Sequence, residues 1–487
     1  MFGNYVYEKS SAQYNDRIII IDNDNLEEIT NYSASFKEHD FKVIKYKDDL
    51  NFRLEYEKKF KSTVNKLVVI ADSHCYIPYD IWCNFHSYVL SLSGLFPKLN
   101  SVQLKGKSKV DLDLICIAYR DVFDNLQKKQ QTDTFFRMKV YSKENILIYL
   151  KYRIKSIQKN VTDAITYKDW FVIAQEKAII DVLAARYNIY VDTADINEKF
   201  CDYVLNNFGK ISQSLDKDSP VLVSKVMDYI NDSSNKFVLI VMDGMSEFDW
   251  NIISRSFEGI RYNKTSVMAM IPTTTSISRQ CLLSNKYPSQ LINPWRQNKE
   301  KQEFINCAKK LGFKEKQINY ERGYETTFSS LVRCATVIIN DVDDLVHAQH
   351  QGRIGMYNDI TVLANQRKLV QLTKKMLASG YDVYITADHG NTPCIGLGKF
   401  MGAGVEVETK SRRMLVLKDF ADKSSIISKY GMIDYPKYYL TKDLNYLVCD
   451  VGTSLDTKGK KVMSHGGITL DEVVVPFIKI KAEDYNG

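Results

Sequence analysis

Short apolar runs, each followed by polar residues, recur through the second half of the chain. They are KFVLIVMD at 236–243, ATVIIN at 335–340, YDVYITAD at 381–388 and MLVL at 414–417. Apolar runs of this length, bounded by polar residues, are typical of buried strands in an open α/β sheet. Ligands of such sheets bind beyond the carboxyl ends of the strands. The pattern therefore predicts an α/β fold with a functional site at that edge.

Three domains are expected along the chain. Apolar, β-branched runs at 17–21 and 66–71, with an amphipathic stretch between them, predict a small N-terminal α/β domain over 1–112. Helical spacing of apolar residues, as in 170–187, predicts a mostly helical middle domain over 113–233. The sheet domain then covers 234–487. Its polar, basic and aromatic stretch at about 293–330 interrupts the alternation and is interpreted as a cap over the site.

The composition excludes several classes of protein. Hydrophobic residues make up 45% of the 487 residues, but runs such as 237–242 are far too short to span a bilayer. The first residues lack the features of a signal peptide, and the nine cysteines include no CxxC pair. We therefore expect a cytoplasmic protein with no membrane segment and no Cys-type zinc site. A net charge of +7 is compatible with a polyanionic partner but does not by itself indicate nucleic-acid binding.

Asp243, Thr275 and Arg279 form the first group of candidate site residues. Asp243 closes an apolar run ahead of Gly244, although an isolated Asp-Gly pair is more often only a turn. The segment IPTTTSISR at 271–279 places Thr275 at the start of a predicted helix, where free amide groups favour a phosphate. A lone threonine there more often only caps the helix. Arg279 lies four residues further on and would share a face with Thr275, within reach of a phosphate oxygen.

Asp343 and His347 are the second group. They are spaced i, i+4 in NDVDDLVH, which on a helical turn directs both side chains to one metal ion. In isolation such a pair is more often part of a solvated helix face. Asp341 and Asp344 are close enough in sequence to be alternatives to Asp343.

Two His-Gly junctions complete the candidate set. Asp388 and His389 stand at the end of the apolar run in ITADHGN, and His465 stands in SHGG ahead of the apolar segment ITLDEVVVPFI. A single histidine in such a place is usually structural. Together, however, the three groups supply three carboxylates, three imidazoles and a hydroxyl, enough ligands for two divalent metal ions. Oxygen and imidazole ligands without thiolates suit zinc or manganese, and magnesium less well.

These residues resemble the alkaline phosphatase superfamily and, within it, the PglZ-domain branch. The resemblance covers roughly 236–480 and includes PTTTSISR, DVDDLVH, ADHG, the paired arginines at 412–413 and SHGGITLDEVVVPF. It implies one metal held by Asp243, Thr275, Asp388 and His389, and a second held by Asp343, His347 and His465. It also implies that Thr275 is the nucleophile. The extra threonine in PTTT leaves the exact register open.

The resemblance implies a two-metal phosphoesterase acting on phosphate diesters or nucleotides. Thr275 would attack phosphorus, or would remain a metal ligand while water attacks, and Arg279 would clamp the phosphate oxygens. Similar proteins occur in bacterial BREX phage-defence systems, which implies a defence or signalling setting with partner proteins. A homodimer is one of the assemblies that the sequence allows.

Three other interpretations compete with a phosphoesterase. The first is a metal-binding scaffold in a defence complex, with a PglZ-like fold but no turnover. The second is an N-terminal receiver domain, because Asp22, Asp24 and Asp72 follow predicted strands. The third is nucleic-acid binding through the basic stretches at 58–66 and 299–322, although solvated helix faces explain the same residues.

Overall fold

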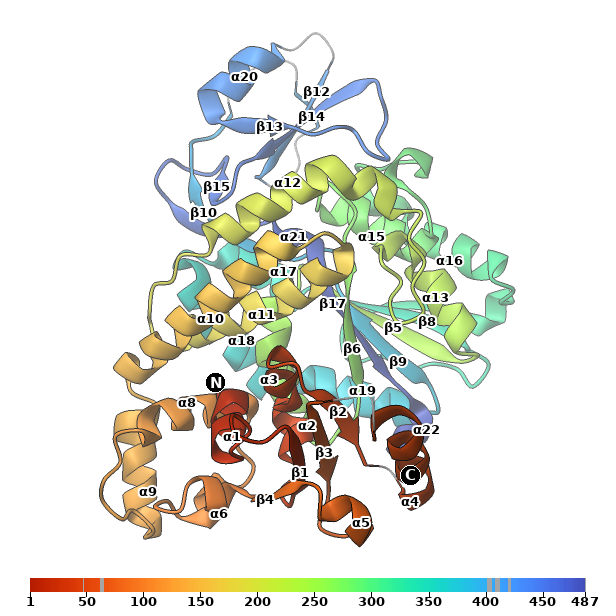
Figure 1. Ribbon diagram of the computed structural model, residues 1–487. Helices are drawn as coiled ribbons and strands as arrows, with labels where there is room; N and C mark the ends of the chain where they lie inside the picture. Colours follow the sequence, from red (N-terminus) through yellow and green to blue (C-terminus); the bar gives the residue numbers. More distant parts are fainter. Residues whose placement is uncertain (47, 62–64, 401–404, 408–411, 419–421, 487) are drawn as a thin grey trace. The chain divides into compact units, whose positions relative to one another are not determined.

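The computed structural model describes residues 1–46, 48–61, 65–400, 405–407, 412–418 and 422–486 (Figure 1). The chain divides into two compact units, Met1–Tyr152 and Arg153–Gly487. The predicted boundaries near 112 and 233 differ from this division. The division falls inside α10 (Lys143–Asp163), and the later helices of the predicted middle domain belong to the second unit, so the middle of the chain does not separate as a unit of its own.

The N-terminal unit contains a four-stranded parallel sheet in the order β2-β3-β1-β4. The apolar runs at 17–21 and 66–71 form two of its strands, as predicted. The strands are β1 (Arg17–Asp22), β2 (Lys42–Lys45), β3 (Leu67–Ala71) and β4 (His86–Leu90). The α-helices of this unit are α1 (Phe2–Lys9), α2 (Leu26–Thr30), α3 (Ser33–Glu38), α4 (Asp49–Glu55), α5 (Tyr79–Trp82), α6 (Leu92–Leu95), α7 (Ser101–Leu104), α8 (Lys109–Tyr119) and α9 (Lys129–Phe135).

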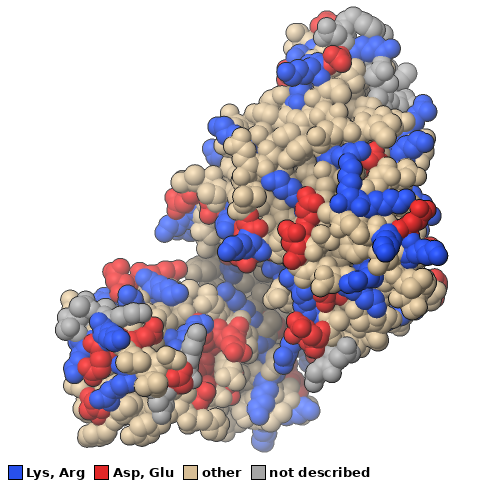
Figure 2. Space-filling view, turned by 90° about the vertical axis from the view of Figure 1, so that its right-hand side faces the viewer, with Lys and Arg blue, Asp and Glu red and all other residues tan. Residues whose placement is uncertain are grey.

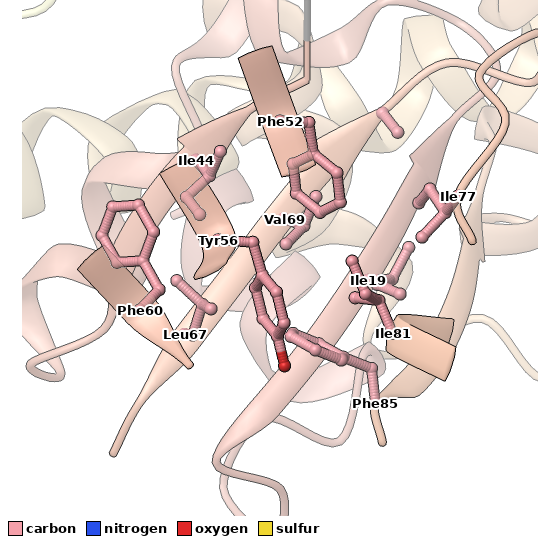
Figure 3. Close-up of a cluster of buried hydrophobic side chains, with 11 residues drawn as sticks. Ile19, Ile44, Phe52, Tyr56, Phe60, Leu67, Val69, Ile77, Ile81 and Phe85 are labelled. Carbon is pink, nitrogen blue, oxygen red and sulfur yellow. The ribbon is translucent and has the colours of Figure 1, made fainter. Parts of the chain in front are cut away.

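One face of this sheet carries an aromatic and aliphatic core (Figure 3). Ile19 of β1 and Leu67 and Val69 of β3 point to the same side, because alternate residues of a strand face the same way. Phe52 of α4 and Phe85 pack against them, and all five side chains are buried. Burial of this many apolar side chains gives the unit a hydrophobic core of its own.

The N-terminal unit differs from the predicted receiver alternative in strand order. Receiver domains have the order 2-1-3-4-5, whereas here β3 lies between β2 and β1. The carboxylates of Asp22 and Asp24 accept hydrogen bonds from backbone amides. Asp22 accepts from the amides of Leu26 and Glu27, and Asp24 accepts from the amide of Leu92. These aspartates therefore have local structural roles, and the topology does not support a receiver domain.

Long helices cover the following segment, as the helical spacing predicted. They are α10 (Lys143–Asp163), α11 (Tyr167–Arg186), α12 (Ala194–Ile211) and α13 (Val226–Ser233). The helix α11 packs on α14 (Glu247–Ile253) and on strands of the C-terminal sheet, and α12 packs on α21 (Leu470–Val473). Among the described residues, we find no helix with both the length and the apolar character needed to cross a membrane.

The central sheet of the C-terminal unit has six strands in the order β6-β17-β9-β5-β8-β7. The strands are β5 (Phe237–Met242), β6 (Asn263–Met268), β7 (Ile318–Arg322), β8 (Cys334–Ile339), β9 (Asp382–Thr386) and β17 (Val474–Ile480). Strands β9, β5, β8 and β7 run parallel, and β17 is antiparallel to both β9 and β6. The other α-helices of the unit are α15 (Thr275–Ser284), α16 (Glu300–Lys310), α17 (Asp341–Ala348), α18 (Gly352–Asn365), α19 (Lys368–Ala378), α20 (Lys423–Tyr430) and α22 (Ala482–Asn486). This is the α/β fold that the sequence predicts.

Two smaller sheets extend the unit. One contains β10 (Thr392–Gly396), β15 (Thr453–Ser454) and β16 (Lys461–Ser464), and β10 pairs antiparallel with β16. In that pairing Thr392 lies opposite Ser464, so the loop that ends at 391 and the loop that begins at 465 adjoin. The other sheet contains β11 (Val405–Val407), β12 (Met414–Lys418), β13 (Met432–Asp434) and β14 (Leu444–Cys449).

Two parts of the predicted sheet domain are placed differently in the structure. The run at 414–417 forms β12, which pairs with β11 and β14 and not with the central sheet. The stretch at 293–330, interpreted as a cap, contains α16 and β7, and β7 pairs parallel with β8 as an edge strand of the central sheet. This stretch therefore extends the sheet and packs against α15.

Candidate metal centre

The carboxyl ends of the parallel strands bring two groups of ligand-type side chains together. Asp243 follows β5, Asp388 and His389 follow β9, and the ligand atoms of these three lie within 4.8 Å of one another. Asp343 and His347 lie on α17 after β8 and form a second group with His465, with the same spacing. The first group is buried. In the second, the His347 side chain is 42% exposed, so this group faces solvent.

The hydrogen bonds of His389 direct one ring nitrogen into the first group. Its Nδ1 lies 3.0 Å from the carbonyl oxygen of Gly390. A carbonyl can only accept, so Nδ1 carries the hydrogen, and in the neutral ring the lone pair is on Nε2. The Thr275 hydroxyl lies 2.9 Å from that Nε2 and 3.4 Å from Asp243 Oδ1. Thr275 therefore lies beside the atoms that would hold an ion.

His465 has the same arrangement in the second group. Its Nδ1 lies 2.9 Å from the carbonyl oxygen of Thr273, which leaves the lone pair on Nε2, 3.5 Å from Asp343 Oδ1. Burial, together with the neighbouring His389, lowers the pKa of His465 to about 4. The ring is then neutral at pH 7, as a metal ligand must be. Burial raises the pKa of Asp343, but the hydrogen bond from His347 lowers it, and this pKa lies below its ordinary value.

Several buried atoms in the two groups have no hydrogen-bond partner among the described residues. They are Asp343 Oδ1, Asp388 Oδ2 and His465 Nε2. Burial and the nearby Asp243 carboxylate raise the pKa of Asp388 well above its ordinary value. Buried polar atoms without partners are costly, and adjacent buried carboxylates repel one another. Divalent cations would relieve both costs, so the residues present fit a pair of metal ions.

The three consecutive threonines have different environments. Thr273 is fully buried; its hydroxyl donates to the Gly467 carbonyl and accepts from the Gly466 amide. Thr274 is the N-cap residue of α15 and is also buried. Thr275 is the first residue of α15, and its hydroxyl is the one that reaches Asp243 and His389. The geometry therefore favours Thr275 over its neighbours as the site hydroxyl.

Two glycines allow the backbone to approach closely at the site. Gly244 has a φ of 73°, and a Cβ there would lie 3.4 Å from Asp343 Oδ1. A Cβ on Gly390 would lie only 2.0 Å from the backbone oxygen of Asp471. Any other residue at 390 would therefore push the loop that carries His389 away from α21.

Arg279 is buried among carboxylates at the first ligand group. Its side chain is 1% exposed; Nη1 donates to Asp243 Oδ2 at 2.5 Å and Nε donates to Glu300 Oε2 at 2.8 Å. Asp388 Oδ2 lies 3.8 Å from the same Nη1. The guanidinium group therefore binds carboxylates of the first ligand group, and its role as a clamp on the phosphate stays a prediction.

Three residues near the site were missed in the sequence. Thr273 holds the SHGG turn, and Glu300 binds Arg279. Glu472 accepts from the Gly467 amide and from Arg413, which lies fully buried beside it. Except for the bond between Gly467 and Glu472, these contacts join residues that are distant in the chain. The one available signal was the presence of charged residues, Arg413 and Glu472, within or next to apolar strands.

The surface charge bears on the nucleic-acid alternative. Figure 2 shows Lys and Arg interspersed with Asp and Glu over the face in view, without a continuous basic stripe. The basic stretch at 58–66 lies partly outside the described residues. A basic patch or stripe is the usual footprint of a nucleic-acid site, and this face does not display one.

A family comparison identifies the larger part of the C-terminal unit. The family described as BREX system PglZ alkaline phosphatase-like domain matches residues 221–480, more than half of the chain. The chain belongs to the PglZ family. This match covers the central sheet and every residue of the two ligand groups. The family resemblance predicted from the motifs is confirmed, and the PglZ domain is the part of the chain that carries the candidate metal centre.

Solved structures resemble the PglZ domain only distantly. Ectonucleotide pyrophosphatase/phosphodiesterase 5 matches at 12% identity and a TM-score of 0.34 for the murine protein, covering 50% of this chain and 88% of that one. The human protein matches at 13% and 0.36, covering 51% and 89%. Phosphonoacetate hydrolase from Sinorhizobium meliloti 1021, in complex with phosphonoformate, matches at 12% and 0.32, covering 50% and 90%. No curated protein matches in sequence. At these scores the matches carry no argument about function.

Proposed function

We propose that the PglZ domain is a metal-dependent phosphoesterase with Thr275 as its nucleophile. The observation that carries this proposal is the position of one hydroxyl, that of Thr275, beside a carboxylate and an imidazole of the buried ligand group. Asp388 Oδ2, Asp343 Oδ1 and His465 Nε2 are buried without hydrogen-bond partners among the described residues, and the Thr275 hydroxyl lies within 3.4 Å of Asp243 and His389. A hydroxyl among metal-type ligands at a helix N-terminus suits attack on a phosphate ester.

Two ions would be held by separate groups. Asp243, Asp388, His389 and the Thr275 hydroxyl would hold one, and Asp343, His347 and His465 would hold the other. Bound divalent ions supply Lewis-acid chemistry: they lower the pKa of a coordinated hydroxyl and stabilise negative charge on phosphate and leaving oxygens. Imidazole and carboxylate ligands favour zinc, with manganese or magnesium as less suited ions.

The chain's own residues account for the remaining steps. The first turn of α15 presents amide groups toward a bound phosphate, beside Thr275. Thr275 Oγ1 attacks phosphorus, the bond from phosphorus to the leaving oxygen breaks, and the hydroxyl proton passes through solvent to the leaving alcohol. The product is a phosphorylated Thr275, which still carries the second organic group when the substrate is a diester. Water hydrolyses that ester and restores the hydroxyl. The half-exposed His347 marks the side from which substrate and water enter.

The substrate class and the setting extend the same proposal. The PglZ resemblance favours phosphate diesters, nucleotides or oligonucleotides, and the BREX-type family favours a role in bacterial antiphage defence with partner proteins. Family membership is an argument by analogy, so the substrate is to be found by assay.

The test compares wild type, Thr275→Ala and Thr275→Ser after metal removal and reloading with zinc or manganese. Substrates are bis-p-nitrophenyl phosphate, p-nitrophenyl phosphate and short oligonucleotides. We expect metal-dependent hydrolysis that is lost in Thr275→Ala and retained in part in Thr275→Ser, which keeps a hydroxyl. Acid quenching followed by mass spectrometry should find phosphate on the peptide that contains Thr275.

The alternative is a metal-binding scaffold in a defence complex. Metal bound without turnover on any of these substrates, with partner binding unchanged in Thr275→Ala, would favour the scaffold. The position of the Thr275 hydroxyl beside both Asp243 and His389 favours the enzyme.

A further inference from the structure

The two oxygens of the Asp243 carboxylate have different neighbours, because Arg279 binds one of them. Its Nη1 donates to Asp243 Oδ2 at 2.5 Å, whereas Asp243 Oδ1 faces the Thr275 hydroxyl at 3.4 Å and His389 Nε2 at 3.6 Å. With one oxygen taken by the guanidinium, only Oδ1 is directed toward an ion. Arg279 thus presents Asp243 as a ligand with a single oxygen.

Arg279 also brings a positive charge into the place where an ion would bind. Its guanidinium is buried 3.8 Å from Asp388 Oδ2, the other carboxylate of that group. A buried cation repels a second cation strongly, because the surroundings screen charge poorly. An opposite charge on the far side of Arg279 would offset this repulsion and let the group bind a divalent ion more tightly.

Glu300 of α16 supplies that charge. Its Oε2 accepts from Arg279 Nε at 2.8 Å, and its side chain is almost fully buried. Its other oxygen, Oε1, accepts from the Tyr320 hydroxyl and from Arg322 Nη2, both on the edge strand β7. Glu300 is held from both sides, so it fixes the plane of the guanidinium as well as offsetting its charge.

We propose that Glu300 is a positioning residue for the metal group formed by Asp243, Asp388 and His389. It orients Arg279 so that Asp243 offers one oxygen to an ion, and it neutralises the arginine charge so that the ion binds tightly. The segment at 293–330 thereby contributes Glu300 to the support of the site through Arg279. This inference rests on the proposed two-metal function.

Glu303 provides a matched control. It lies one helical turn after Glu300 on α16, is equally buried, and pairs with Lys286 Nζ at 2.6 Å. Glu303→Gln removes the same charge from the same helix. Because Glu303 pairs with Lys286, the Glu303→Gln variant measures the general effect of neutralising a buried glutamate without changing the contacts of Arg279.

The experiment measures zinc binding to chelator-stripped full-length protein by titration calorimetry, for wild type, Glu300→Gln and Glu303→Gln. We expect two zinc equivalents in wild type. In Glu300→Gln one of the two should bind at least about tenfold more weakly, which corresponds to about 1.4 kcal/mol. The other should be unchanged, and Glu303→Gln should match wild type. Hydrolysis by Glu300→Gln should recover when free zinc is raised, a response that a general loss of structure would not give.

The outcomes separate the two proposals. If wild type binds neither zinc nor manganese, the proposed function fails and this inference fails with it. If wild type binds two equivalents and Glu300→Gln binds them like Glu303→Gln, the inference alone is overturned. If Glu300→Gln does not fold, Glu300→Asp is measured in its place. This variant keeps the charge but shortens the side chain, so we expect zinc to bind more weakly at one site. Wild-type affinity at both sites would overturn the proposal.

Discussion

Asp471 is at the centre of a buried charge cluster whose loss should destabilise the C-terminal unit. Its carboxylate accepts from Lys177 Nζ at 2.9 Å, Arg353 Nη2 at 3.0 Å and Asn197 Nδ2 at 3.2 Å. Asp181 pairs with the same two cations. The cluster holds two positive and two negative charges, so it is neutral. Through these ion pairs and hydrogen bonds the cluster connects α11, α12 and α18 to α21, the helix that follows the SHGG turn.

Asp471→Asn should remove one charge and leave a net positive cluster in the interior. Breaking a buried pair by removing one partner costs about 3–5 kcal/mol, because the remaining charge loses its compensation. Domains are stable by only about 5–15 kcal/mol in total. We therefore expect a fall of about 3 kcal/mol or more in the free energy of unfolding, a large share of the stability of the domain.

The measurement is urea unfolding of wild type, Asp471→Asn, and the double variant Lys177→Met/Asp471→Asn. The double variant removes one charge of each sign and leaves Asp181 paired with Arg353 at 3.3 Å. It should recover at least about half of the lost stability, because the cluster is neutral again. A loss below about 1 kcal/mol in Asp471→Asn, or a double variant less stable than the single one, would refute this reasoning.

Further predictions concern pH and the metal groups. Burial raises the pKa of Asp471, but the charges of Lys177 and Arg353 lower it, and this pKa lies below its ordinary value of 3.8. The ionised carboxylate therefore stabilises the fold above pH 3.8, and this stabilisation is lost as the pH falls below that value. The stability difference between wild type and Asp471→Asn should therefore narrow below about pH 4; a difference that grows in acid would contradict this. His347→Ala should lose one of two metal equivalents on dialysis and keep the other, measured by elemental analysis, because His347 belongs to the exposed group only; loss of both would contradict separate groups. Thr273→Val, nearly isosteric, should lower hydrolysis by about tenfold or more, because the SHGG turn loses two hydrogen bonds worth about 0.5–1.5 kcal/mol each; unchanged kcat and metal content would show that His465 is held without them.

The central strands and the strand-end residues could be predicted because both depend on local pattern. The runs at 236–243, 335–340 and 381–388 are buried on both faces, and such strands read as continuous apolar stretches. Since parallel strands end at one edge, Asp243 and the Asp388–His389 pair necessarily meet there. The spacing of Asp343 and His347 is likewise local, being one turn of α17.

The remaining features depend on pairing between distant segments. The run at 414–417 has the same apolar pattern as the central strands, yet β12 pairs with β14 in another sheet, because an isolated run does not specify its partner. The stretch at 293–330 was interpreted as a cap because it is polar, but Glu300 and Glu303 are polar residues buried in ion pairs. Arg279 was assigned to the phosphate from helical spacing alone, which could not reveal Glu300 on its other side.

The most direct test of the metal centre is a crystal structure of the zinc-loaded protein with anomalous diffraction data collected at the zinc edge. We expect two anomalous peaks at the strand ends. One should lie about 2.0–2.2 Å from ligand atoms of Asp243, Asp388 and His389, and the other at the same distance from Asp343, His347 and His465. The Thr275 hydroxyl should lie at the first ion. Zinc bound elsewhere, or ordered protein in zinc with no peak at these residues, would contradict the account.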